Sequence, residues 1–411
     1  LRINLDRLWA DLMASAAIGR TAKGGLRRLA LSPEDGEMRR LFRRWCEDAG
    51  MTVAVDAMGN MFARREGRNP QAKAIMMASH LDTQIHGGRF DGILGVLGGL
   101  EVVRTLNDNA IETEHPIIVC NWTNEEGARF EPPMLGSRVF CGLQTPESAH
   151  AITDRDGVSL GAALDAIGCR GDAGLSAADL DSYFELHIEQ GPELDEKKVQ
   201  VGIVPGAFDV RWAVIEVLGE NAHAGPTRMA DRRNAVVGAA LIIKAINDIG
   251  WAYAASGGRT TTARLTLEPN LLGIISHRAE MLCDFRHPVR GIPQDMFDAF
   301  AARLPALALE SRCAITVLRD WRYGAMDYDA PLTGLVRQSA DDLGYSRMDV
   351  LTVAGHDSMN MAQVVPSCMI FTPCEKGISH NEAENVTPAD IEPGANVLLH
   401  AVLKRDRQAS T

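Results

Sequence analysis

The stretch AIMMASHLDTQIHGGRFDGILGVLGGLEVVRTLND, residues 74–108, decides the fold. Its apolar start, residues 74–78, predicts a short buried strand, and residues 92–108 predict a buried helix. Residues 79–92 between them hold two histidines, two aspartates and three glycines. Polar groups between a buried strand and a helix are typical of an α/β fold, in which functional residues gather at the carboxyl ends of strands.

The same order recurs on both sides of this stretch. Residues 116–122, PIIVCNW, predict a second strand, and the polar segment TNEEGARF follows it directly. Residues 34–50 have helical periodicity, and residues 51–67 predict a hairpin that turns at Gly59 and Asn60. Near the C-terminus the segments GLVRQSADDLG, MDVLTVAG and PSCMIFTP resume the α/β pattern.

A different pattern occupies the middle of the chain. It predicts, in order, a strand at 210–219, a helix at 232–250, strands at 262–269 and 279–286, a helix at 294–310 and a strand at 314–321. This β-α-β-β-α-β order is the split, ferredoxin-like unit. We therefore expect a small α+β domain, residues 212–325, inserted into a discontinuous α/β domain made of residues 1–211 and 326–411.

The composition limits the partners and the compartment. The net charge of -12 argues against nucleic acid and against an anionic membrane as partners. The N-terminus predicts an amphipathic helix in place of a signal peptide, although a leader before Leu1 stays open. The eight cysteines include no CxxC pair, so we expect a reduced, cytoplasmic protein that does not enter a membrane.

Five segments combine acidic residues with histidine or glycine, each near the end of a predicted strand: SHLDT (79–83), FDG (90–92), TNEEG (123–127), ELHIEQGP (185–192) and GISHNEAE (377–384). Imidazole and carboxylate are the ligands that zinc prefers when no thiolate is involved. Each segment alone has an ordinary explanation, since TNEEG, for instance, suits the first turn of a helix. All five together favour a metal site.

The spacing within these segments suggests roles. On a strand the side chains of His80 and Asp82 share a face, so we expect the Asp82 carboxylate to accept the outer ring N–H of His80. The glycines at 87, 88 and 92 would let a tight turn bring Asp91 back over His80. Of the adjacent carboxylates Glu125 and Glu126, one can bind metal while the other stays free to accept a proton.

The number of candidate ligands exceeds what one catalytic ion with an open position needs. They are His80, Asp91, Glu126, His187 and His380. Such a set suits two divalent ions that share one carboxylate at a separation of roughly 3.5–4 Å. Zinc is the first expectation for these ions, and manganese and cobalt accept the same ligands. His86 is surplus to this set, and the remaining histidines outside acidic segments suit surface or packing roles.

Taken in order, these motifs resemble the hydantoinase/carbamoylase family of zinc-dependent amidases, within the dinuclear-zinc aminoacylases and carboxypeptidases. The resemblance covers nearly the whole chain through KGGLRRLALSPED, MGNMFAR, SHLDT, GGRFDGILGVLGGLEVVRTLN, NWTNEEGARF, FELHIEQGP, AHAG, DFRHP, AGHDSM and GISHNEAE. It implies a zinc-peptidase-like catalytic domain with a central mixed sheet, and it identifies the inserted ferredoxin-like domain as a lid or dimerisation domain.

The resemblance also implies roles for individual residues. Asp91 would bridge two zinc ions, and Glu125 would be the general base. His223 in AHAG resembles a histidine that acts in the partner subunit's site, so a homodimer is implied. Arg286 in DFRHP resembles an arginine that grips the substrate carboxylate. The catalytic set thus comprises Glu125, Asp82 and His223, and the expected substrate contacts are Arg286, Gln190, Gly273, Asn270 and His356.

Two departures from the family pattern lie in the inserted domain. Gly273 in PNLLGIISH (269–277) stands where the family usually has an asparagine that helps to hold the substrate, and AHAGPTRM has Pro226 and Arg228 in place of the usual threonine and proline. Loss of that side chain would favour bulky substrates over small ones, unless Asn270 or His277 supplies the missing contact.

These features together predict a metal-dependent amidohydrolase that cleaves a linear C–N bond in a small substrate with a carboxylate. An N-carbamoyl amino acid is the expected substrate, giving the amino acid, ammonia and carbon dioxide. One alternative is the same catalyst acting on an N-acyl amino acid, a dipeptide-like amide or an allantoate-like ureide. The other alternative is a non-catalytic binding protein that has kept the fold.

Overall fold

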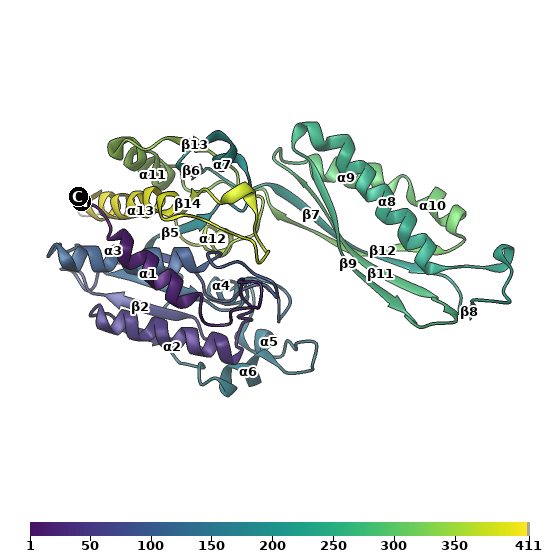
Figure 1. Cartoon of the computed structure of the whole chain (residues 1–411), viewed down its shortest axis with the longest axis horizontal. Helices are drawn as coiled ribbons and strands as arrows, with labels where there is room; N and C mark the ends of the chain where they lie inside the picture. Colours follow the sequence, from purple (N-terminus) through teal and green to yellow (C-terminus); the bar gives the residue numbers. More distant parts are fainter. Residues whose placement is uncertain (409–411) are drawn as a thin grey trace. The chain divides into compact units, whose positions relative to one another are not determined.

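A computed structural model describes residues 1–408 and divides them into two compact units (Figure 1). Unit 1 comprises Leu1–Pro205 together with the described residues from Asp327 onward, and unit 2 is Gly206–Met326. The chain therefore leaves unit 1 once, forms unit 2 and returns. Each unit has a buried apolar core of its own.

Unit 1 is built on an eight-stranded mixed sheet. Its strands, in spatial order, are β1 (Thr52–Val55), β2 (Met61–Arg65), β4 (Ile117–Trp122), β3 (Ala74–His80), β5 (Leu180–Ile188), β14 (Ser367–Thr372), β6 (Val201–Val204) and β13 (Arg347–Asp349). The four central strands β4, β3, β5 and β14 run parallel, whereas β2 and β6 run antiparallel to their neighbours β4 and β14. The carboxyl ends of the four parallel strands therefore meet at one edge.

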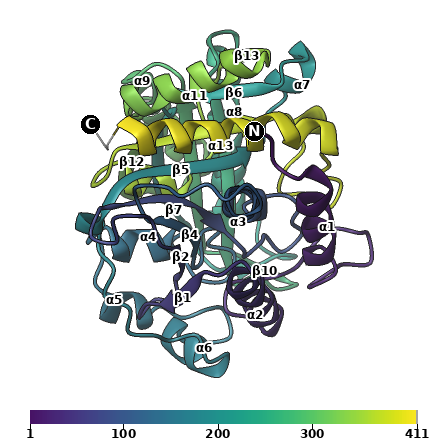
Figure 2. The ribbon, with the colours of Figure 1, turned by 90° about the vertical axis from the view of Figure 1, so that its left-hand side faces the viewer.

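Helices cover both faces of this sheet. One face packs on α1 (Leu5–Ser15), α2 (Pro33–Asp48), α3 (Ile93–Asp108), α11 (Ala330–Leu343) and α13 (Pro388–Gln408), and Figure 2 shows α13 in yellow. The other face packs on α4 (Leu135–Phe140) and α12 (Asp357–Met361). The short helices α5 (Pro146–His150), α6 (Leu160–Ala166) and α7 (Glu193–Lys197) complete the unit. All residues of β3 and β4 are buried because both faces are covered, which explains their unbroken apolar runs.

Unit 2 has a four-stranded antiparallel sheet in the order β12 (Ala314–Gly324), β7 (Asp209–Leu218), β11 (Arg278–His287) and β9 (Arg259–Glu268). Its helices α8 (Ala235–Tyr253), α9 (Ile292–Ala301) and α10 (Leu304–Ser311) pack on one face. The single helix expected at 294–310 is in fact two, because Pro305 starts a new helix in α10. A short pair of strands, β8 (Ala222–His223) and β10 (Ile274–Ile275), lies outside the sheet.

Two sequence-level properties have a direct structural counterpart. All eight cysteine thiols are free, and six of them are buried. Among the described residues one helical segment, Ala235–Ser256, is long and apolar enough to cross a membrane by length and composition alone. The side chains of Ala239, Ile242 and Ile246 from this segment are buried in the core of unit 2, as in an ordinary amphipathic core helix.

Candidate metal centre

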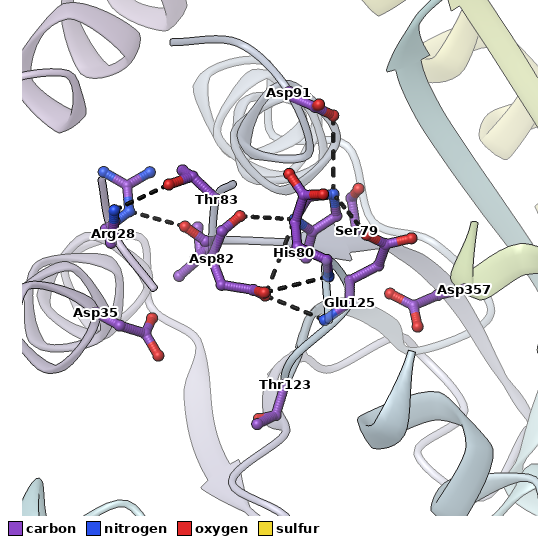
Figure 3. Close-up of polar contacts among 12 residues, drawn as sticks. Arg28, Asp35, Ser79, His80, Asp82, Thr83, Asp91, Thr123, Glu125 and Asp357 are labelled. Atoms are coloured by element: carbon purple, nitrogen blue, oxygen red, sulfur yellow. Dashed lines mark hydrogen bonds and ion pairs between the residues drawn. The ribbon is translucent and has the colours of Figure 1, made fainter. Parts of the chain in front are cut away.

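The five acidic and histidine-containing segments come together at the carboxyl edge of the parallel strands in unit 1. His80 is the last residue of β3, and His187 is near the end of β5. Glu125 and Glu126 follow β4, Asp91 precedes α3, and His380 lies in the loop between β14 and α13. Figure 3 shows His80, Asp91 and Glu125 pointing toward one another. The apolar strands thus position all candidate ligands, because parallel strands end at the same edge of a sheet.

The candidate ligands form two groups that share Asp91. The first group is His80, Asp91 and His187, and the second is Asp91, Glu126 and His380; in each group the ligand atoms lie within 4.8 Å of one another. Asp91 Oδ1 is 3.2 Å from His187 Nε2, and Asp91 Oδ2 is 3.4 Å from His380 Nε2. Each group therefore has its own oxygen of the Asp91 carboxylate, as a bridging ligand would require.

The hydrogen bonds of the histidines fit metal binding. His80 Nδ1 donates to the carbonyl of Asp82, and His187 Nδ1 donates to the carbonyl of Ile188, each at 2.9 Å. In the neutral rings this leaves Nε2 with a lone pair that faces the carboxylates. His187 Nε2 and Glu126 Oε1 are buried without a hydrogen-bond partner among the described residues. A divalent cation would satisfy these atoms, since neutral imidazole and carboxylate are suitable ligands.

Asp82 does not contact His80 in the way that the strand alternation suggested. Its nearest carboxylate oxygen is 4.0 Å from His80 Nδ1, which bonds the main-chain carbonyl of Asp82. The carboxylate instead accepts the backbone N–H groups of Glu125 and Glu126, both at 3.2 Å. Figure 3 shows Asp82 beside Glu125. Burial, and then the charge of Asp35, raises the pKa of Asp82 to about 7. Asp82 thus holds the loop that carries both glutamates.

The glycines make room for side chains as well as for a turn. Gly92 has φ +70°, and a Cβ there would lie 2.3 Å from the ring of His80. A Cβ at Gly88 would lie 1.9 Å from the carboxylate carbon of Glu384. That buried carboxylate accepts the backbone N–H of Phe90 at 3.0 Å and of Asp91 at 3.1 Å. The sequence did not predict Glu384 as a site residue, although it lies in GISHNEAE. Its position in that motif does not show that its carboxylate bonds the backbone N–H groups of Phe90 and Asp91.

Glu125 belongs to neither ligand group but lies beside the first. Its Oε2 is 3.5 Å from His80 Nε2, and the residue is only 7% exposed. Burial, followed by the charges of Asp357 and Glu126, raises the pKa of Glu125 well above its ordinary value. Cations held by the neighbouring groups would oppose that rise. The arrangement provides a carboxylate next to two potential cation sites that can accept a proton from a bound molecule.

Two residues expected to contact substrate lie against the ligands themselves. The amide of Gln190 donates to Asp91 Oδ2 at 3.0 Å and to the hydroxyl of Ser379 at 3.2 Å. His356 is buried, and its ring centroid is 4.5 Å from that of His187. With Glu185 and His187 it makes a third group of potential ligand atoms within 4.8 Å. Gln190 and His356 therefore contact candidate metal ligands directly, Asp91 and His187 respectively.

The other expected residues lie in unit 2. His223 in β8 pairs with Ile274 in β10, and its Nδ1 accepts the N–H of Gly225 at 3.1 Å, which in the neutral ring leaves Nε2–H as a donor. Next to this pair Gly273 has φ +86° and open space around it. Asn270 lies between β9 and β10. Arg286 in β11 donates to Asp284 at 2.8 Å and lies over the ring of Trp212, 5.4 Å from its centroid.

Comparison with known proteins agrees with this architecture. Residues 76–404 match the model of peptidase family M20/M25/M40. The chain is 43% identical to an N-carbamoyl-L-amino-acid amidohydrolase of Rhizobium meliloti, over 98% of this chain and 97% of the relative. It is 36% identical to an N-carbamoyl-L-amino acid amidohydrolase of Geobacillus stearothermophilus, over 97% of each.

A solved structure of a related amidase has the same fold. The crystal structure of an amidase of the hydantoinase/carbamoylase family from Burkholderia vietnamiensis matches with a TM-score of 0.92 and 45% identity, over 98% of each chain. The α/β fold class with a central mixed sheet, expected from the sequence, is confirmed. The chain belongs to peptidase family M20/M25/M40 and, within it, to the hydantoinase/carbamoylase amidases.

Proposed function

We propose that this chain is a metal-dependent amidohydrolase that removes the carbamoyl group from N-carbamoyl amino acids. The observation that carries the proposal is the pair of ligand groups that share Asp91, with the free carboxylate of Glu125 beside them. The names of the Rhizobium and Geobacillus relatives support the substrate class. The reaction would yield the amino acid, ammonia and carbon dioxide.

The ligands would hold two divalent ions, one at His80, Asp91 and His187 and the other at Asp91, Glu126 and His380. Zinc suits these nitrogen and oxygen donors, and manganese or cobalt would also bind. When bound, the ions would supply positive charge that polarises the substrate carbonyl and lowers the pKa of a water molecule. Gln190 and Ser379, which both bond Asp91 Oδ2, would keep the shared carboxylate oriented.

The protein groups would then move one proton. Glu125 accepts a proton from the attacking water as the water oxygen bonds to the carbamoyl carbon. The Nε2–H group of His223 stabilises the oxyanion that develops on the carbonyl oxygen. Glu125 returns the proton to the nitrogen of the amino acid as the C–N bond breaks. The carbamate that is released decomposes to ammonia and carbon dioxide.

A substrate screen tests this proposal. Zinc-reconstituted enzyme should hydrolyse N-carbamoyl amino acids and release amino acid, ammonia and carbon dioxide in equal amounts, and chelation should abolish that activity. Gly273 has a positive φ and open space around it, so an asparagine fits there. Gly273→Asn restores the side chain that is usual in the family and should improve kcat/KM for N-carbamoyl-β-alanine relative to bulky substrates. Faster turnover of N-acyl amino acids or ureides would reassign the substrate. Failure to turn over any of these amides with metal bound would favour a binding protein.

We further propose that the enzyme is a homodimer in which His223 completes the active site of the partner subunit, with unit 2 serving as the lid or dimerisation domain. Inactive Glu125→Gln chains mixed with inactive His223→Ala chains should then regain activity, because each mixed dimer has one complete site. Tagged subunits should be used to measure exchange. Exchange without recovery would mean that His223 serves its own chain or has no catalytic role.

A further inference from the structure

A cavity of about 710 Å³ lies in unit 1, outside the metal centre. Its walls come from residues 27–33, from Ile85, from Ala128 and Arg129, and from residues 154–167 with part of α2. None of the candidate metal ligands lines it. We call it the arginine cavity, because Arg27, Arg40, Arg129 and Arg155 from four different segments line it, the first two and the last with exposed side chains.

The charges around the arginine cavity are not balanced. Two aspartates, Asp154 and Asp156, face the four arginines, so the lining carries four positive and two negative charges in a chain of net charge -12. Asp154 is already used: it pairs with Arg129 Nε at 2.9 Å and accepts the backbone N–H groups of Asp156 and Val158. Among the lining residues Asp156 is then the one acid left to balance the other three arginines, so the lining keeps an excess of positive charge.

Arg129 is held in place, whereas the other three arginines have no partner among the residues that the structure describes. One terminal nitrogen of Arg129 donates to the carbonyls of Ala30 and Leu31, at 3.1 and 2.7 Å. The guanidinium groups of Arg27, Arg40 and Arg155 make no ion pair or hydrogen bond with any part of the chain that the structure describes. Guanidinium groups match the geometry of carboxylate and phosphate groups, so unpaired arginines around one cavity suit an anion.

The remainder of the wall is apolar. Leu29, Leu31, Val158, Ala163 and Ile167 line the same cavity. The volume lies within the range of about 300–1,000 Å³ that is usual for small-molecule sites. An inorganic anion would leave this apolar wall without a partner, and a neutral molecule would leave the arginines without one. A ligand with one anionic group and one apolar part satisfies both.

We propose that the arginine cavity binds a small organic anion. Its carboxylate or phosphate group lies against Arg27, Arg40 and Arg155, and its aliphatic or aromatic body lies against Leu29, Leu31 and Ile167. This site is separate from the metal centre and does not depend on the reaction proposed above.

Photo-crosslinking of the metal-loaded full chain tests the proposal. The probe is a six-carbon aliphatic carboxylate that carries a diazirine, and its methyl ester is the uncharged control. The acid should label peptides that contain residues 27–40 and 154–167, and the ester should not. Hexanoate should compete for this labelling, whereas inorganic phosphate at the same concentration should not.

Variants make the assignment specific. The double substitution Arg40→Gln and Arg155→Gln should reduce labelling of these peptides by at least about tenfold, the effect of losing one hydrogen bond to a charged group. Arg44→Gln is the matched control, because Arg44 is exposed on the same helix, α2, and lines no part of the cavity. Both variants should keep the thermal midpoint of the wild type, since the replaced side chains are exposed. The proposal would be overturned if the double variant or the ester were labelled as strongly as the wild type with the acid. It would also be overturned if inorganic phosphate removed the labelling, or if labelling appeared only at the metal centre.

Discussion

Glu125→Gln is expected to lower kcat by about 10²–10⁴-fold, the usual contribution of a general base, while the metal content stays unchanged. Glutamine keeps the size and the hydrogen bonding of glutamate but cannot accept the proton of the attacking water. Glu125 Oε2 lies 3.5 Å from His80 Nε2, yet Glu125 belongs to neither ligand group. The measurements are kcat with an N-carbamoyl amino acid and the metal content of the purified protein.

Glu126→Gln provides the matched comparison. Glu126 has nearly the same sequence environment, but its Oε2 lies 3.3 Å from His380 Nε2 within the second ligand group. We therefore expect Glu126→Gln to lose metal as well as activity. If Glu125→Gln loses metal and Glu126→Gln retains it, the roles of these two neighbours have been assigned the wrong way round.

The sequence predicts the scaffold of the centre well because the scaffold depends on short-range patterns. The strands β3 and β4 have unbroken apolar runs, which parallel strands covered on both faces require. Polar residues directly after such strands must come to the carboxyl edge of the sheet. His80, Glu125 and Glu126 follow this rule. The break between α9 and α10 in unit 2 was not predicted. Apolar residues continue through both helices, and this pattern hides the interruption of the backbone at Pro305.

The partners of individual side chains are harder to predict, because they depend on loops that are distant in sequence. Strand alternation places Asp82 on the same face as His80, but it cannot show that the loop after β4 offers two backbone N–H groups to Asp82. In the same way, the tight space around Gly88 becomes meaningful only when Glu384, almost 300 residues later, fills it. Such contacts are visible only once the chain is folded.

Asp91→Asn is expected to reduce the metal content from about two ions per chain to at most one and to lower kcat by about 10³-fold or more. An amide has one ligating oxygen, whereas Asp91 presents Oδ1 to His187 and Oδ2 to His380. The remaining amide nitrogen cannot bind a cation. Cations provide several kcal/mol of transition-state stabilisation, and about 1.4 kcal/mol corresponds to a factor of ten in rate.

The zinc-dependent shift in unfolding temperature, measured for each protein against its own metal-free form, separates this effect from general damage. The negative charge of Asp91 adds to burial in raising the pKa of Glu126 to about 8, although His380 opposes the rise. Against burial, however, the hydrogen bonds and charges of His187 and His380 hold the pKa of Asp91 itself well below its ordinary value. The Asp91 charge therefore stabilises the metal-free fold, and metal-free Asp91→Asn should unfold at a lower temperature than the metal-free wild type. Zinc should then stabilise the wild type much more than the variant.

Ser379→Ala is the control for this prediction. Ser379 contacts Asp91 Oδ2 at 3.2 Å through its hydroxyl group but is not a member of either ligand group. Its loss removes a hydrogen bond to a charged carboxylate, worth about 1.5–3 kcal/mol, so kcat should fall by no more than about a hundredfold and two ions should remain bound. An Asp91→Asn protein that retains two tightly bound ions would show that the two groups do not share this carboxylate, because its single amide oxygen could not serve both.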